Sequence, residues 1–192
     1  MKKLMMAVAI VCAAAAANAA TVQWKSGTLY GAKDADGGKG TKLVNNSAVL
    51  ASGTTEAMFV WLVDSVEYGK YAGKDQSVIF DAYNGKAGAA STTGTGTSLQ
   101  VNTTASVGVD QYAIIIATYT DKTYGDMYMA TTATIAGSAI EAPDNTYQIS
   151  NILSGTGGNP SLSNNWQAVP EPTSGLLLLL GVAGLALRRR RA

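Results

Sequence analysis

The sequence predicts an all-β fold, an antiparallel β-sandwich-like domain that lies between two helical end segments. Three observations predict it: the body is rich in Gly, Ala, Ser and Thr, short β-branched and aromatic runs recur along it, and turn residues separate these runs. The chain is long enough for one domain with a real core. We divide it into a leader (1–19), a β-rich body (20–153), a Gly/Ser/Asn-rich spacer (154–168) and a tail (169–192).

The predicted strands are short. They cover Val22–Lys25, Thr28–Tyr30, Lys42–Leu50, Ala57–Asp64, Ser98–Thr104, Gln111–Thr120, Met127–Ile135 and Thr146–Ile152. The clearest unit is a hairpin in which residues 112–120 and 127–135 flank the turn 121–126, and the Thr and Ala residues of its second strand predict one buried and one solvent-facing side. Residues 57–63 are apolar without alternation, so we expect this strand at the centre of a sheet, covered on both sides.

Other segments of the body have weaker patterns. Residues 75–83 are predicted as a short helix, with Asp75 as N-cap and with Ile79 and Tyr83 on one side. Residues 91–98 are a low-complexity loop, and residues 154–165 form the flexible part of the spacer. Trp166 has two interpretations, because an indole there can lie in the interface of a membrane or pack back as the last strand.

The leader has the three parts of a secretory signal peptide. A positive start, Met1-Lys2-Lys3, precedes a short apolar run and a small-x-small site formed by Ala17, Asn18 and Ala19. We predict that signal peptidase cuts this helix off after Ala19, so that Ala20 becomes the first residue of the mature chain. The alternative is a cut after Ala20, which would place the less usual Asn18 at the third position before the cut. Cys12, the single cysteine, is lost with the leader.

The tail combines a short apolar run with a terminal cluster of charges. Residues 175–187 would rise about 20 Å as a helix, against a hydrocarbon core of roughly 30 Å. We therefore predict a short transmembrane helix that spans the membrane transiently. The arginines that follow it, Arg188, Arg189, Arg190 and Arg191, are stop-transfer charges that stay in the cytoplasm, which places residues 170–172 at the outer face.

The tail resembles a known sorting signal. Val169, Pro170, Glu171 and Pro172, followed by the apolar run and the arginines, are similar to the PEP-CTERM sorting signal in order and position. The resemblance implies that residues 170–172 are read by exosortase, a membrane-embedded, cysteine-dependent processing enzyme of Gram-negative bacteria that make extracellular polysaccharide. It also implies an inner-membrane-tethered intermediate that faces the periplasm, and then a location at the cell surface or outside the cell. The resemblance covers the tail alone.

The composition of the body excludes several functions. Residues 20–168 hold 8 lysines, no arginine and 12 carboxylates, which gives a net charge of −4. Nucleic acid is therefore a poor candidate partner, because binding to phosphates needs a basic patch. The body has no histidine and no cysteine, so it lacks disulfides, imidazole bases and the usual zinc ligands. We expect no catalytic residue, no metal site and no cofactor.

Two groups of acidic residues suggest more specific chemistry. Asp34 and Asp36 begin like a calcium loop, but the later ligand positions hold Lys and Asn, which favours an ordinary Asp/Gly turn. Glu56, Asp64 and Glu67 could supply the carboxylate pair of a glycosidase. Closeness in sequence does not establish the required separation across a cleft, and solvated charges at strand ends are the simpler interpretation.

Aromatic residues offer a binding function as the alternative. A sugar-stacking platform could be built from Trp24, Trp61, Tyr68, Tyr71 and Tyr83, although packing in the core and at its edges explains the same residues more simply. We expect an exported, non-enzymatic structural protein of the cell surface or extracellular matrix. Signal peptidase and exosortase are its partners during maturation, and extracellular polysaccharide is a candidate partner afterwards. The alternative is a carbohydrate-binding module or a glycan-active enzyme delivered by the same route.

Overall fold

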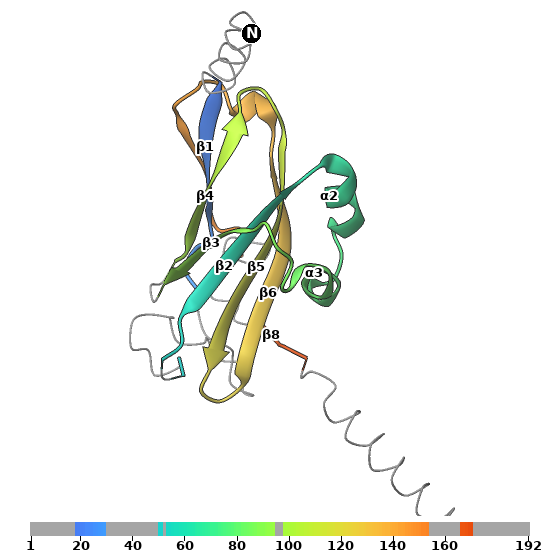
Figure 1. Ribbon diagram of the computed structural model, residues 1–192, viewed down its shortest axis with the longest axis vertical. Helices are drawn as coiled ribbons and strands as arrows, with labels where there is room; N and C mark the ends of the chain where they lie inside the picture. Colours follow the sequence, from blue (N-terminus) through green and yellow to red (C-terminus); the bar gives the residue numbers. More distant parts are fainter. Residues whose placement is uncertain (1–17, 30–49, 52, 95–97, 154–165, 171–192) are drawn as a thin grey trace, which may run out of the picture.

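The computed structural model describes residues 18–29, 50–51, 53–94, 98–153 and 166–170, which fold mainly as two β-sheets packed face to face (Figure 1). This confirms the predicted β-rich fold with few helices. The elements in chain order are β1 (Ala19–Lys25), β2 (Glu56–Val63), α2 (Ser65–Tyr71), α3 (Gln76–Tyr83), β3 (Ala90–Gly94), β4 (Gln100–Ser106), β5 (Gln111–Asp121), β6 (Gly125–Ile135), the 3-10 turn η1 (Gly137–Ala139), β7 (Thr146–Ile149) and β8 (Gln167–Ala168).

One sheet has the strand order β4-β1-β7 and the other β3-β2-β5-β6-β8. Every neighbouring pair is antiparallel except β1 and β7, which run parallel. The prediction of a purely antiparallel sandwich is wrong at this pair. After β6 the chain crosses to the other sheet through η1, and β7 then starts beside the start of β1, where the Asp144 N–H donates to the Ala19 carbonyl at 2.9 Å. Since no hairpin joins β1 to β7, nothing forces them into opposite directions.

The space between the sheets holds the larger core. Alternate residues of each strand point into it, which is the period of two expected of a strand. Its fully buried members include Val22, Trp24, Met58, Ile115 and Ile140. The Trp24 indole N–H donates to the Thr103 hydroxyl at 2.7 Å, so the largest core side chain has its polar atom satisfied.

A second core covers the outer face of the five-stranded sheet. Helices α2 and α3 lie on this face (Figure 1), and Phe80 of α3 stacks on Tyr128 of β6 at 3.8 Å between ring centroids. Strand β2 is therefore covered on both sides, as predicted from its unbroken apolar run. The expectation of one wet side for the second hairpin strand is wrong for residues 127–130, which are all buried because α3 packs against β6.

The predicted hairpin is confirmed. Strands β5 and β6 pair from Gln111↔Ile135 to Asp121↔Gly125. The turn is shorter than predicted, because the Asp121 carboxylate accepts the N–H groups of Thr123 and Tyr124 at 2.7 and 3.1 Å and closes it locally. Gly125 has φ +76°, the conformation that ends such a turn.

The helices are partly as predicted. Helix α3 is confirmed, with Asp75 at the N-cap and with Ile79 and Tyr83 buried, although the Asp75 side chain makes no capping hydrogen bond. Helix α2 was not predicted. The Asp64 carboxylate accepts the N–H of Glu67 at 2.7 Å, so Asp64 is the N-cap of this helix.

Three predicted boundaries need correction. Residues 90–94, expected mostly as loop, form β3, since their backbone pairs with β2 from Val60↔Ala90 to Glu56↔Gly94. Thr28 and Leu29 are not strand residues, because Gly27 turns the chain at φ +79° after β1. Strand β7 ends at residue 149, three residues earlier than expected. Most of the predicted strand 42–50 and residues 154–165 of the spacer lie outside the described residues.

Candidate functional site

The last described residues of the chain form an edge strand. Strand β8 pairs with β6 through Met127↔Ala168 and Tyr128↔Gln167. The Tyr128 hydroxyl donates to the Gln167 side-chain oxygen at 2.6 Å, and the Val169 N–H donates to the Asp126 carbonyl at 2.8 Å. Residues 167–169 are therefore part of the five-stranded sheet.

Trp166 packs back onto the domain. Its side chain is 7% exposed, in the core between the sheets, and its ring meets Tyr119 edge to face with 4.5 Å between centroids. Of the two interpretations of Trp166, the packed one is correct. Val169 is half-buried against the outer core, and Pro170 is exposed. The predicted sorting motif therefore begins on the sheet and enters solvent at its second residue.

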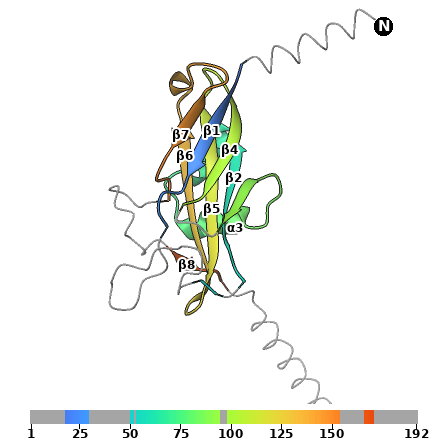
Figure 2. The same cartoon turned by 90° about the vertical axis from the view of Figure 1, so that its left-hand side faces the viewer.

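The remaining residues of the predicted tail signals, Glu171, Pro172 and Arg188 to Arg191, lie outside the described residues, as does Ala17 of the signal peptidase site. Ala19 is the first residue of β1, and Ala20 is buried in the inner core opposite Ala105. A cut after Ala19 would therefore leave a mature chain that begins inside β1. Figure 2 shows β1 entering at one pole of the sandwich and β8 leaving at the other.

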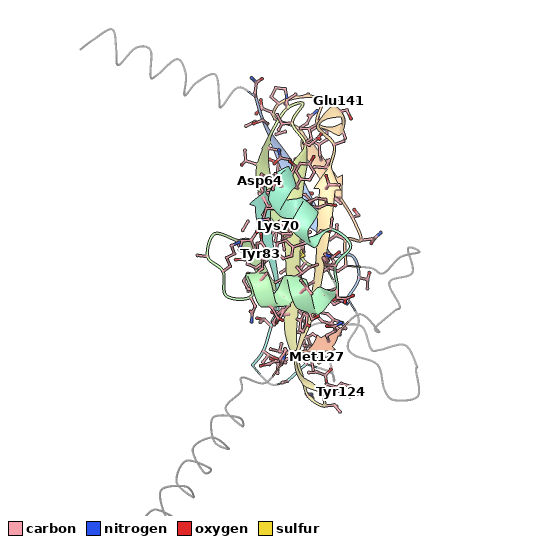
Figure 3. All side chains as sticks on the ribbon, turned by 90° about the vertical axis from the view of Figure 1, so that its right-hand side faces the viewer. Asp64, Lys70, Tyr83, Tyr124, Met127 and Glu141 are labelled. Atoms are coloured by element: carbon pink, nitrogen blue, oxygen red, sulfur yellow. The ribbon has the colours of Figure 1, made fainter. Side chains whose placement is uncertain are left out.

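A shallow hollow of about 570 Å³ lies on the outer face, between the end of β2, α2 and the loop after α3. Its polar lining is supplied by Asp64, Glu67, Tyr83 and Lys86. Figure 3 shows Asp64, Lys70 and Tyr83 on this face of the molecule. Two of the acids considered for catalysis, Asp64 and Glu67, therefore lie in one hollow.

Glu67 is the centre of the charges in this hollow. Its Oε2 accepts a hydrogen bond from Lys70 Nζ at 2.6 Å, and its Oε1 accepts one from the Tyr83 hydroxyl at 3.0 Å. Lys86 Nζ lies 3.9 Å from Oε1 and 4.0 Å from the centroid of the Tyr83 ring. The hydrogen bond from Lys70, followed by that from Tyr83, lowers the pKa of Glu67, while burial raises the pKa of Tyr83. Glu67 is thus a paired carboxylate and is poorly suited to donate a proton.

The third acid lies on the other side of the sheet. Glu56 is at the start of β2, on the same side as Met58 and Val60, which point into the core between the sheets. The sheet separates it from Asp64 and Glu67, so the structure does not bring Glu56 into a carboxylate pair with either. Within the described ranges no group of three acidic residues is arranged to hold a metal ion, and Asp34 and Asp36 lie outside them.

The aromatic residues do not form an exposed row. Trp24 is in the inner core, on the opposite side of the sheet from the others. Trp61 and Tyr71 each meet Tyr83 edge to face, at 5.3 and 5.4 Å between centroids, and Trp61 is only 6% exposed. Tyr68 contacts Tyr112 instead, at 5.1 Å. Ring faces that a sugar would stack on are largely used within the protein.

Sequence reasoning left one feature of this region open and missed another. The pairing of residues 167–169 with β6 was one of the two interpretations of Trp166, and the sequence could not choose between them because a two-residue strand has no periodicity. The role of Asp64 had a visible signal, since Asp at one position with Glu three residues later is typical of a helix start.

Comparison with known proteins bears on the tail alone. Neither the curated proteins nor the solved structures include a match to this chain. Among the described residues, no helix combines the length and apolar character that a membrane crossing requires. Residues 168–191 match the model of the PEP-CTERM protein-sorting motif. The C-terminal tail of this chain therefore carries that motif, which implies export, a membrane-anchored intermediate and processing by exosortase.

Proposed function

We propose that this chain is a structural protein of the cell surface or extracellular matrix, delivered and processed through its C-terminal motif. The observation that carries the proposal is the direct joint between domain and motif. Val169 is bonded to Asp126 of the sheet, and the motif continues from the next residue. A folded β-sandwich is thus attached to the sorting tail without an intervening linker, as suits a domain displayed at a surface.

The acidic residues support a structural role over catalysis. Asp64 caps a helix, Glu67 is held by two hydrogen bonds, and Glu56 is buried behind the sheet. Glycoside hydrolysis needs two carboxyl groups that face each other across a substrate, at a separation of roughly 5 to 10 Å. Among the described residues, Asp64 serves as a helix cap, Glu67 is paired with Lys70 and Tyr83, and Glu56 is enclosed in the core.

Replacement of Glu171 by Ala tests the proposal in a host that makes exosortase. The variant should still be exported but should accumulate as precursor in the membrane fraction, whereas the wild-type chain reaches the surface or matrix. Glu141→Ala, an exposed change at the far pole, is the matched control and should mature normally. Unchanged maturation of Glu171→Ala would contradict sorting through this motif.

A glycan panel tests the alternative class. The purified domain should cleave none of the glycans, and any retention of a glycan should not depend on the outer hollow. Cleavage that disappears in Glu67→Gln would replace the structural role by an enzymatic one. Retention that disappears in Lys86→Ala would favour a carbohydrate-binding module that uses the outer hollow.

A further inference from the structure

The junction between the sandwich and the sorting tail defines which residues a processing enzyme can reach. A peptidase holds the chain around its cut as an extended strand, which requires free backbone groups on both sides of that bond. From Trp166 to Val169 the chain is engaged by the domain, through the backbone of residues 167–169 and through the side chains of Trp166, Gln167 and Val169. The contacts are the two ladder pairs of β8, the Val169 N–H to Asp126 bond, the Gln167 to Tyr128 bond and the burial of the Trp166 ring.

The side chains of Trp166 and Val169 pack on opposite faces of the five-stranded sheet. The Trp166 ring enters the core between the sheets against Tyr119, and the Val169 side chain packs on the outer core. Detaching β8 would therefore expose an indole and uncover the edge of β6 at the same time. Pro170 follows the last residue that is bonded to the sheet, and its side chain is exposed.

We infer that Trp166 to Val169 stay in the sheet during processing, so that exosortase cuts on the C-terminal side of Pro170 or further along the tail and the mature protein keeps β8. The inference rests on the proposed function and adds the boundary of the processed product. One peptide bond is broken. Water, or an amine on an acceptor, takes the acyl group of the domain, and the released tail leaves with a new amino group.

The mass of the mature protein is the first test. Purified from a host that makes exosortase, the processed chain should begin near Ala20 and end at Pro170 or later, with β8 retained. A mature C-terminus at Val169 or earlier would overturn the inference, although sorting through the motif would still stand. A chain that is never processed would instead refute the proposed function and the inference together.

A disulfide that locks β8 onto β6 is the second test. The bond from Val169 to Asp126 makes their pair a hydrogen-bonded one, so the next pair, Met127 and Ala168, is the closer type with Cα atoms about 4.5 Å apart. Met127→Cys with Ala168→Cys should form a disulfide in the oxidising periplasm, and the mature chain has no other cysteine. The locked precursor should mature to the same extent as wild type.

Two controls keep this result interpretable. Each single-cysteine variant should mature normally, which shows that the substitutions leave the fold intact. Tyr112→Cys with Thr134→Cys, a β5–β6 pair at the other pole, should lock the sheet without touching β8. Locked Met127–Ala168 precursor that accumulates while the control pair matures would overturn the inference, because it would show that β8 must detach. Failure of the disulfide to form would contradict the pairing itself.

Discussion

Glu56 is a buried acid that has no hydrogen-bond partner among the described residues. It is 0% exposed, and its carboxylate oxygens accept no hydrogen bond from any residue that the structure describes. Burial raises the pKa of Glu56 from 4.5 to about 7. A buried ionised carboxylate without hydrogen bonds is costly, so the folded state favours the neutral acid.

The direction of the pH effect follows from this raised pKa. Well below pH 4.5 Glu56 is neutral in the folded and the unfolded chain, so it imposes no electrostatic cost. As the pH rises through about 7, the folded chain must ionise a buried group that the unfolded chain ionises in water. The free energy of unfolding therefore falls, by about 3 kcal/mol at most.

Glu56→Gln should remove this loss, because glutamine keeps the shape without the charge. Urea denaturation at about pH 5 and about pH 8.5 should show a larger fall in unfolding free energy for wild type than for the variant. Glu141→Gln, at an exposed acid, should behave as wild type. Equal pH dependence in wild type and Glu56→Gln would show that Glu56 is ionised at little cost.

The sequence could not distinguish this residue from its neighbours in the acidic group. Glu56, Asp64 and Glu67 lie within one short stretch, and all three were candidates for one catalytic pair. Their separation depends on β2 running between them, with Glu56 on its inner side and α2 beginning just after its end. A period of two along a continued strand would put Glu56 and Asp64 on one side, whereas the start of α2 at Ser65 places Asp64 and Glu67 on the outer face.

At the scale of elements, η1 depends on a close approach of two backbone segments. Gly137 donates its N–H to Asp110 Oδ1 at 2.6 Å, and a Cβ at Gly137 would lie 2.7 Å from the Val109 nitrogen and still closer to the Gly108 carbonyl. These are backbone atoms, so they cannot rotate away. Only glycine fits where η1 passes the turn between β4 and β5.

Gly137→Ala should therefore lower the free energy of unfolding by about 1–3 kcal/mol. Gly69→Ala is the matched control, because Gly69 lies inside α2 with open space around it and should gain up to about 1 kcal/mol from the higher helix propensity of Ala. Urea denaturation of residues 20–170 carrying each change should give shifts of opposite sign. Two shifts of the same sign would contradict the contact at Gly137.

Elements with a strong local signal could be predicted from the sequence. The β5–β6 hairpin joins two apolar runs across a short turn, and α3 follows an N-cap residue with apolar residues four apart. Strand β3 could not be predicted, since its Ser-Thr-Thr-Gly sequence is typical of loops and its structure comes from the backbone of β2. For Trp166 the sequence allowed a membrane interface or the protein core, and the structure places its ring in the core against Tyr119.

At the scale of the whole molecule, we expect the domain to fold without its two targeting segments. Residues 20–170, which retain β8, should give a β-type circular dichroism spectrum and a cooperative thermal transition. EDTA should leave the transition temperature unchanged, since the described residues hold no group of metal ligands. A fall of several degrees with EDTA would point to Asp34 and Asp36 as a calcium site.

The start of β1 and strand β8 lie at opposite poles of the sandwich (Figures 1 and 2). Strand β6 has 11 residues and so spans about 36 Å from the pole near β8 toward the pole where β1 starts. The first residues of β1 and the residues of β8 are therefore separated by about the length of the sandwich. The pole formed by η1 and the first residues of β1 is thus the end of the sandwich that lies away from the start of the sorting motif.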